Sequence, residues 1–209
     1  FFNIKKFICN EKVTHYLNFA AVKHVRSEEN IDSMKYMFNT NAEKFLPFSN
    51  FNEKNYLKKV FSVSSDKAVN PCSILGVSKK LMESKLSYFK KKNPSIFVSS
   101  ARFANVSFSN GSILKRIIDC ISENKPIGIP RNIKRYFITH QEAANLCLKS
   151  LLKDVDGNIL VPETNNLMQL VDIKSICEKI LDNFETNLKN FKQVTQKYLR
   201  LVISSEGRL

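Results

Sequence analysis

Hydrophobic residues in the first half of the chain follow two alternating patterns. Nearly continuous hydrophobic runs, such as residues 60–64, are typical of buried strands. Between these runs hydrophobic residues recur at helical spacing, and Asn30 stands where a helix cap is expected. Strands without a polar face that alternate with helices predict an α/β fold, a parallel sheet covered by helices. In order, we expect a strand at 14–22, a helix at 31–45, a strand at 59–64, a helix at 75–90 and a strand at 95–106.

After residue 106 the predicted elements become shorter. They are a helix at 112–123, extended pieces at 126–130 and 134–140, a helix at 141–152, a strand at 157–163 and a helix at 167–184 with Leu170, Ile173, Ile176 and Ile180 along one face. From Glu185 the chain is polar and weakly patterned, and no element is predicted there. We therefore expect three parts, which are residues 1–106, residues 107–184 interleaved with the first part, and a tail at 185–209.

The net charge of +14 suits a nucleic-acid or anionic-membrane partner, but it also suits a lysine-rich solvated surface. The densest basic run is Lys90–Pro94. The other lysines are spread along the whole chain, and no interleaving of arginine with aromatic residues forms a groove-reading element. The pattern favours the solvated surface, and a basic nucleic-acid-binding module stays an alternative.

The five cysteines are scattered and form no Cys-x-x-Cys pair, so we expect neither a disulfide framework nor a metal site. Cys147 and Cys177 lie among apolar helical neighbours, which indicates small buried hydrophobic residues rather than reactive thiols. No apolar run approaches the roughly 18 residues that span a bilayer, and the first residues lack the pattern of a signal peptide. We therefore expect a cytoplasmic protein that does not insert into membranes.

Polar side chains gather where the strand at 59–64 ends. The run Ser64–Lys67 follows the hydrophobic residues directly, and Pro71 stops regular structure before the next helix. Ligands of open parallel sheets bind outside the carboxyl ends of the strands, and two further ends are Ala20–Ala21 and Arg102–Asn105. His24 follows the first of these; it can contact a ligand or be purely structural, and the sequence favours neither.

Leu75 and Lys79 are four residues apart on the predicted helix, so their side chains share one face. Asp66 and Lys67 are consecutive and would point to opposite faces of a regular strand. Both can reach one site only if the strand has already ended. From the spacing alone, a surface ion pair in a serine-rich loop remains the simpler interpretation.

Five ordered motifs cover most of residues 15–180. They are SVSSDKAVNP with ILGVSKK (62–71 and 74–80), LNFAAVKHV (17–25), Thr40-Asn41, ARFANVSFSNGS (101–112), and IPRNIKRYFIT with EAANLCL (129–139 and 142–148). As a set they resemble the UDP-N-acetylglucosamine 4,6-dehydratases of bacterial polysaccharide and glycan biosynthesis, in the extended short-chain dehydrogenase/reductase superfamily. The resemblance implies a Rossmann-like domain followed by a smaller α/β part that binds a UDP-sugar, and a homo-oligomer.

In that family an NADP-linked redox elimination takes place, and we expect NADP here with NAD as the alternative. The cofactor accepts hydride from C4 of the sugar, the C5 proton becomes acidic, water leaves from C6, and the hydride returns to C6. Lys67 matches the base for the C5 proton, and Asp66 matches the acid that protonates the departing hydroxyl. Ser65 matches the hydroxyl that binds the C4 oxygen, and Lys79 matches the amine that binds the nicotinamide ribose.

The remaining site residues are also implied by the resemblance. On the cofactor side they are Ala20, Ala21, Val22, Asn41, Ser64, Lys79 and Arg102, with Asn41 fixing nearby strand ends. On the substrate side they are Lys67, Asn105, Arg131 and Arg135, whose amide and guanidinium groups suit a diphosphate.

The chain departs from the family at two places. Leu75 stands where most of the superfamily has a tyrosine that takes the C4 hydroxyl proton, so Lys79, Lys67 or a water is the candidate for that task. The motif G-x-G-x-x-G, which seats the cofactor pyrophosphate, does not occur in the sequence. We therefore expect a fragment without the first βαβ units, which binds NADP weakly and turns over poorly by itself.

A nucleotide-sugar 4-epimerase or reductase of the same superfamily is the alternative enzyme. Its chemistry stops at C4 and needs no acid and base at C6 and C5. The pair Asp66 and Lys67 therefore favours the dehydratase.

Overall fold

The computed structural model describes part of the chain, namely residues 4, 7–8, 10–23, 28, 30–46, 56–123, 125–130, 132–162, 170–190 and 201–204. It divides into two compact units. Unit 1 comprises Phe1–Phe103 and Gln141–Pro162, and unit 2 comprises Ala104–His140 and Glu163–Leu209. We expected a boundary after residue 106, and the chain passes from unit 1 to unit 2 after Phe103. Residues 141–162 belong to unit 1 again.

Unit 1 is built on a four-stranded sheet of order β1-β2-β3-β8. The strands are β1 (His15–Asn18), β2 (Lys59–Ser65), β3 (Phe97–Phe103) and β8 (Ile159–Leu160), and every neighbouring pair is parallel. The in-register pairing of β2 with β3 brings Ser64 opposite Arg102 and Ser65 opposite Phe103. The predicted parallel sheet is confirmed, and its carboxyl ends carry the polar residues of the expected site.

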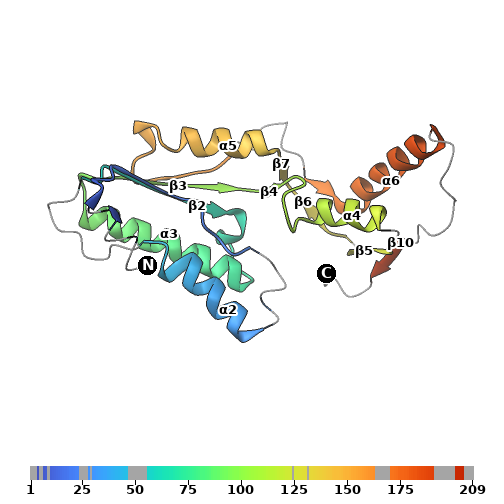
Figure 1. The fold of residues 1–209 in the computed structure, drawn as a ribbon, viewed down its shortest axis with the longest axis horizontal. Helices are drawn as coiled ribbons and strands as arrows, with labels where there is room; N and C mark the ends of the chain where they lie inside the picture. Colours follow the sequence, from blue (N-terminus) through green and yellow to red (C-terminus); the bar gives the residue numbers. More distant parts are fainter. Residues whose placement is uncertain are drawn as a thin grey trace. The chain divides into compact units, whose positions relative to one another are not determined.

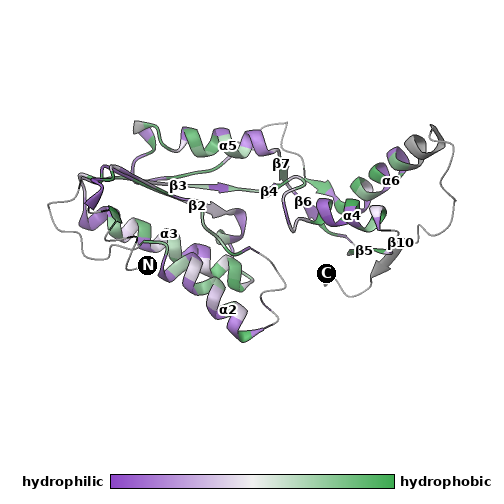
Figure 2. Ribbon diagram, in the orientation of Figure 1, coloured by the Kyte–Doolittle hydropathy of each residue, from purple (hydrophilic) through white to green (hydrophobic). Residues whose placement is uncertain are grey.

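Helices cover both faces of this sheet, as Figure 1 shows. The helix α3 (Ile74–Lys92) lies on one face with α2 (Ile31–Phe38) beside it, and α5 (His140–Lys149) lies on the other. Successive residues of a strand point to opposite faces, so β2 contributes Val60 to the core under α3 and Phe61 to the core under α5. Both helices carry hydrophobic and hydrophilic residues in turn, because each has one face on the sheet and one in water (Figure 2).

The helix starts follow from capping side chains. The Asn30 side chain accepts hydrogen bonds from the backbone N–H groups of Asp32 and Ser33, which confirms the predicted cap of α2. Ser73 caps α3 by accepting from Gly76 at 3.2 Å, so that helix begins one residue before the predicted start. The coil of α2 continues as a π-helical turn at Asn39–Glu43, closed by a hydrogen bond from Lys44 N to Asn39 O.

The prediction of a buried strand over 14–22 was wrong in length and burial. The strand β1 covers only His15–Asn18, and in the described part of the chain it pairs with β2 alone. Leu17 is 41% exposed and Phe19 is 57% exposed, whereas Asn18 is buried. A strand with one neighbouring strand has fewer residues around it to cover its side chains. The hydrophobic run therefore predicted more burial than the strand has.

The described residues of unit 2 form short strands and two helices, α4 (Ile113–Ser122) and α6 (Ile173–Asn190). Its strands are β4 (Asn105–Val106), β5 (Ile127–Pro130), β6 (Lys134–Arg135), β7 (Phe137–Ile138), β9 (Val171–Asp172) and β10 (Leu201–Ser204). They pair as β4 with β7 and β5 with β10 in parallel, and β6 with β9 antiparallel. The core is formed by Ile117, Ile129, Ile173 and Cys177, which are at most 2% exposed.

Two predictions for unit 2 are corrected. Leu170 does not belong to α6, which begins at Ile173 after β9 and is capped by Asp172, whose Oδ2 accepts from Ser175 N at 3.1 Å. Leu170 is instead 50% exposed. The segment after Glu185 is not without structure, since α6 continues to Asn190 and residues 201–204 form β10. No helix among the described residues is long and apolar enough to cross a bilayer.

Candidate active site

Asp66 and Lys67 meet in a turn directly after β2. The strand ends at Ser65, and residues Asp66–Ala68 form a 3-10 turn that the Ser65 hydroxyl caps by accepting from Lys67 N at 3.2 Å. Asp66 Oδ1 accepts from Ser65 Oγ at 2.8 Å and from Lys67 Nζ at 3.1 Å. The condition set by the sequence is therefore met, because the strand ends before Asp66 and the two consecutive side chains reach one place.

The pair is also partly open to solvent. The Lys67 side chain is 38% exposed and the Asp66 side chain is 41% exposed. An ion pair at this exposure contributes little to stability, so packing gives no strong reason for its presence. A hydroxyl, a carboxylate and an amine are thus held within hydrogen-bond reach of one another at the carboxyl end of a central strand, where a ligand can approach them.

Lys79 is buried beneath the same strand end. It is 3% exposed, and its Nζ donates to Val63 O of β2 at 2.9 Å. Burial lowers the pKa of Lys79 from 10.5 to about 8, although the nearby Glu83 carboxylate acts in the opposite direction. An amine with this pKa is neutral in a larger fraction near neutral pH than an ordinary lysine, and it can accept a proton more readily there.

The lowered pKa of Lys79 predicts a stability difference that depends on pH. Between about 8 and 10.5 the unfolded chain binds more protons at this lysine than the folded chain, so the folded state gains stability as the pH rises through that window. Relative to Lys79→Met, the wild type should gain about 3 kcal/mol of unfolding free energy between about pH 7 and pH 10.5. Urea unfolding of both proteins across that range measures this difference. The exposed Lys80→Met variant is the control, and a pH-independent difference for Lys79→Met would contradict the assignment.

Gly76 brings α3 directly against the Asp66–Lys67 turn. A Cβ atom at this glycine would lie 2.6 Å from Lys67 O and 3.1 Å from Pro71 Cα, both backbone atoms. Real Cβ atoms do not approach backbone so closely, so any larger residue must push the helix and the turn apart. The first turn of α3 therefore sets the position of Lys67.

Asn41 fixes the chain after β1. Its side chain accepts from Val22 N and donates to Val22 O, each at 2.8 Å, and it also donates to Ser78 Oγ of α3 at 3.2 Å. Asn41 is 1% exposed, so these bonds are made in the interior. The residue that Asn41 holds, Val22, lies four positions after the end of β1 at Asn18. Asn41 also ties Ala20–Val22 to the helix that carries Lys79.

Ser64 and Arg102, both expected on the cofactor side, contact a carboxylate that sequence reasoning missed. Ser64 Oγ donates to Glu83 Oε1 at 2.6 Å, and Arg102 binds both Glu83 oxygens, with Nε at 2.7 Å and Nη2 at 2.6 Å. The hydrogen bond to Glu83 raises the pKa of Arg102. The available signal was the spacing, since Glu83 lies one helical turn after Lys79 on the same face.

The remaining site candidates lie elsewhere or outside the described residues. Asn105 Nδ2 donates to Tyr136 O at 3.1 Å, and Arg135 Nη1 donates to Lys134 O at 3.0 Å, both in unit 2. Leu75 is 7% exposed, and its backbone N–H donates to Glu28 Oε1 at 3.0 Å. Arg131 and His24 lie outside the described residues.

The described residues fit the nicotinamide end of a dinucleotide. The buried Lys79 amine lies at the carboxyl end of β2, and small residues follow β1 at Ala20–Ala21, which leave room for a flat ring. No G-x-G-x-x-G segment occurs in the 209-residue sequence, so no residue can be assigned to the pyrophosphate. The fit is therefore limited to one half of the cofactor.

The parallel sheet with helices on both faces is also the fold of solved nucleotide-sugar enzymes. The structure is similar to that of DesIV, a dTDP-glucose 4,6-dehydratase from Streptomyces venezuelae with NAD and TYD bound, with a TM-score of 0.74. The match covers 97% of this chain and 65% of that chain, at 14% sequence identity. At this identity the likeness establishes the fold alone.

The chain belongs to the family described as "Polysaccharide biosynthesis protein", whose model matches residues 3–198. It is 25% identical over 162 residues to the capsular polysaccharide biosynthesis protein CapD of Staphylococcus aureus, covering 73% of this chain and 26% of CapD. It is 32% identical over 115 residues to the UDP-glucose 4-epimerase of Rickettsia canadensis, covering 53% of this chain and 33% of the epimerase. The chain thus spans only part of the length of these relatives.

Proposed function

We propose that this chain carries the catalytic segment of an NADP-dependent 4,6-dehydratase that acts on a UDP-N-acetylhexosamine, UDP-N-acetylglucosamine in particular. The observation that carries the proposal is the cluster at the end of β2, where Asp66 Oδ1 lies 2.8 Å from Ser65 Oγ and 3.1 Å from Lys67 Nζ. Elimination of water from a 4-keto sugar needs a base at C5 and an acid at C6, which are adjacent carbons. An amine and a carboxyl group in contact can serve adjacent carbons of one ring.

The elimination itself can be written for the residues of this cluster. Lys67, as the neutral amine, takes the proton from C5, and the electrons of that bond form the C5–C6 double bond. The bond from C6 to its oxygen breaks, and Asp66, as the carboxylic acid, gives its proton so that water leaves. Ser65 donates a hydrogen bond to the C4 oxygen. A bound nicotinamide supplies the hydride acceptor for C4 and the donor for C6.

The elimination starts from Lys67 as the neutral amine and Asp66 as the neutral acid. Lys67 Nζ lies 3.1 Å from Asp66 Oδ1, and these neutral forms differ from the ion pair by the position of one proton, with the same net charge. After water leaves, the two groups are again charged, and Lys67 returns its proton to C5. The C4 hydroxyl releases one further proton, which restores the acid form of Asp66.

The other assigned residues complete the proposal. Lys79 binds the nicotinamide ribose. Asn41 holds Ala20–Val22 on the cofactor side through its two hydrogen bonds to Val22. Asn105 and Arg135 of unit 2, with Arg131, bind the substrate diphosphate. We place the enzyme in the cytoplasm as a homo-oligomer, with NADP preferred over NAD.

A 4-epimerase is the second candidate, because the relative from Rickettsia canadensis, named UDP-glucose 4-epimerase, is 32% identical over 115 residues. Such an enzyme oxidises and reduces C4 without touching C5. The two candidates therefore differ in the fate of the C5 proton.

The test uses a preformed UDP-4-keto-6-deoxy-N-acetylhexosamine in deuterated water. Its ketone already acidifies the C5 proton, so exchange at C5 needs the base but no hydride transfer. We expect the protein to introduce deuterium at C5, measured by NMR or mass spectrometry. Absence of exchange, together with interconversion of UDP-N-acetylglucosamine and its C4 epimer when NADP or NAD is added, would overturn the dehydratase in favour of the epimerase. Binding to DNA or RNA that weakens steeply with salt, without UDP-sugar binding, would overturn both.

A further inference from the structure

We propose that Ser64, Glu83 and Arg102 form a clamp that positions Lys79, and that Ser64 and Arg102 act through Glu83 rather than by touching the cofactor. The proposal rests on the function proposed above for Lys79, and it adds three positioning residues to that site. We name these three residues the Glu83 clamp.

The clamp joins three elements at the carboxyl ends of the strands. Glu83 belongs to α3, Ser64 to β2 and Arg102 to β3, and Ser64 and Arg102 are direct partners in the parallel register. Glu83 Oε1 accepts from Ser64 Oγ and Arg102 Nε, while Glu83 Oε2 accepts from Arg102 Nη2, all between 2.6 and 2.7 Å. One carboxylate therefore fixes the helix to two neighbouring strands.

Lys79 contacts β2 at the residue that precedes Ser64. It lies one helical turn before Glu83 and donates to Val63 O, while Glu83 binds Ser64, the next residue of β2. Two successive turns of α3 thus contact two successive residues of the strand. Because a rigid helix contacted at two points can neither slide nor rotate, the Glu83 bonds determine where the Lys79 amine lies.

Glu83 also adds an electrostatic effect to this geometry. It is 5% exposed, and its carboxylate is paired with the Arg102 guanidinium. Charged residues close to Lys79 along α3 and at the strand ends include Lys80 and Glu83, Arg102 of β3, and Asp66 and Lys67 after β2. Glu28, which accepts from Leu75 N, and Glu43, which pairs with Lys85, also contact α3. Of these described groups, Glu83 is the one whose charge raises the pKa of Lys79 against the effect of burial.

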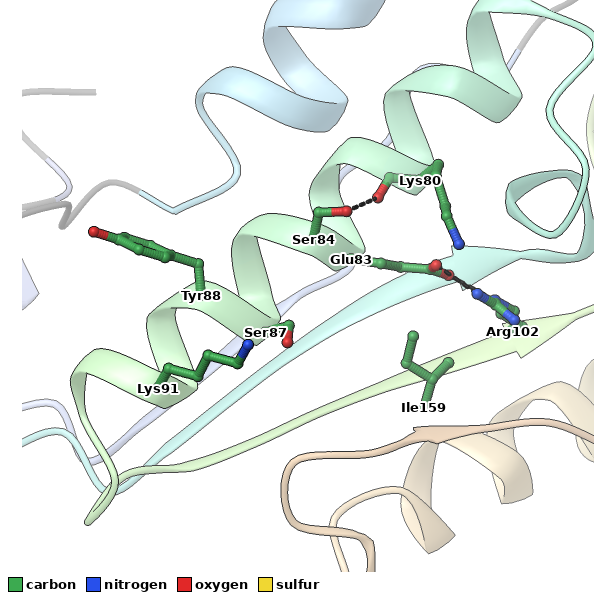
Figure 3. Close-up of a pocket in the computed structure, with 8 residues that line it drawn as sticks. All are labelled: Lys80, Glu83, Ser84, Ser87, Tyr88, Lys91, Arg102 and Ile159. Atoms are coloured by element: carbon green, nitrogen blue, oxygen red, sulfur yellow. Dashed lines mark hydrogen bonds and ion pairs between the residues drawn. The ribbon is translucent and has the colours of Figure 1, made fainter.

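The clamp faces a surface groove on its outer side, as Figure 3 shows. This groove has a volume of about 350 Å³ and is lined on α3 by Lys80, Ser84, Ser87, Tyr88 and Lys91, with Ile159 of β8 opposite. Glu83 and Arg102 point toward each other in the groove. The Arg102 side chain is 19% exposed and the Glu83 side chain 4%, so water reaches the guanidinium rather than the carboxylate. Substitution of Arg102 or Ser64 therefore changes the surroundings of Glu83 without filling the cofactor side.

The test measures Lys79 itself and needs neither sugar nor cofactor. The ¹³Cε resonance of Lys79 is titrated in protein labelled at lysine and assigned by its absence from Lys79→Arg. In Glu83→Gln the titration midpoint should fall below the wild-type value of about 8, because the carboxylate that favours the ammonium form is gone. Ser64→Ala, which removes a single hydrogen bond from Glu83, should lower the midpoint by less. Glu83→Asp should leave it closer to the wild type than Glu83→Gln does.

The matched control is Glu43→Gln, because Glu43 pairs with Lys85 of the same helix at 2.8 Å but is exposed. A midpoint of Lys79 that stays at the wild-type value in Glu83→Gln and Ser64→Ala, or moves equally in Glu43→Gln, would overturn the clamp. If Glu83→Gln does not fold, Ser64→Ala alone decides the matter. Failure of C5 exchange in the wild type would overturn the proposed function instead and would leave this titration unchanged.

Discussion

Exchange of the C5 proton should slow by about 10²- to 10⁴-fold when Lys67 is replaced by alanine, the range that a positioned general base contributes. The substrate is the preformed UDP-4-keto-6-deoxy sugar in deuterated water, so hydride transfer does not limit the rate. Asp66 remains in Lys67→Ala, but it loses its 3.1 Å partner and has no second amine from the turn to replace it. Deuterium at C5 is followed over time by NMR.

The control for Lys67 is Lys80→Ala, which removes an exposed lysine of α3 from the surface groove. It changes the net charge by the same amount as Lys67→Ala but removes no member of the Ser65, Asp66 and Lys67 cluster. It should therefore exchange at the wild-type rate. Exchange that proceeds unchanged in Lys67→Ala would remove Lys67 from the role of base. Binding of the sugar by both variants, measured by calorimetry, separates loss of chemistry from loss of affinity.

Gly76→Ala should reduce the same exchange rate by about 10²-fold, although alanine is the better helix former. The new Cβ would meet Lys67 O at 2.6 Å, so the helix and the turn must separate and the Lys67 amine must move from its place beside Asp66. A displacement of about 1 Å in a catalytic group is enough for a loss of this size. The free energy of unfolding should also fall, by about 1–3 kcal/mol, as for other overpacked sites.

The matched control for Gly76 is Val77→Ala at the next position of the helix, which is 42% exposed. It changes helix propensity without a new contact, and it should leave the exchange rate unchanged. A wild-type exchange rate in Gly76→Ala would mean that the close approach of α3 does not position Lys67. Loss of stability without loss of exchange would lead to the same conclusion.

Local patterns in the sequence were sufficient to predict the sheet and the turn at its centre. The strand at 59–64, the polar run that follows and the helix after Pro71 correspond to β2, the 3-10 turn and α3 within one or two residues. These elements depend on nearest neighbours, such as the Ser65 and Ser73 caps, which lie within a few positions of the groups they bind.

The features that could not be predicted depend on contacts between residues far apart in the sequence. The strand β10 pairs with β5, which lies more than seventy residues earlier, and its run of three hydrophobic residues is too short to identify a strand without that partner. Glu83 also depends on distant residues, because its buried carboxylate accepts hydrogen bonds from Ser64 and Arg102, each nineteen residues away. Its role is visible only when β2 and β3 are paired.

The start of α6 and the extent of β1 were missed for a different reason. Leu170 fits the helical spacing of Ile173 and Ile176. However, Asp172 caps the helix, so the helix begins after it, and Val171–Asp172 form β9. In β1 the hydrophobic run continued past Asn18, where the Asn18 and Asn41 side chains take over the backbone bonds of Ala20 and Val22. A side chain that replaces a strand partner leaves no mark in a hydrophobicity pattern.

The π-helical turn at Asn39–Glu43 makes the site depend on the number of residues as well as on their identity. Its hydrogen bond from Lys44 N to Asn39 O encloses one more residue than an α-helical turn does. Deletion of a single residue between Phe38 and Asn41 would restore the ordinary period and rotate Asn41 by about 100° around the helix axis. The amide would then face away from Val22 and Ser78. Insertions and deletions in this short segment are therefore as restricted as substitutions at the site.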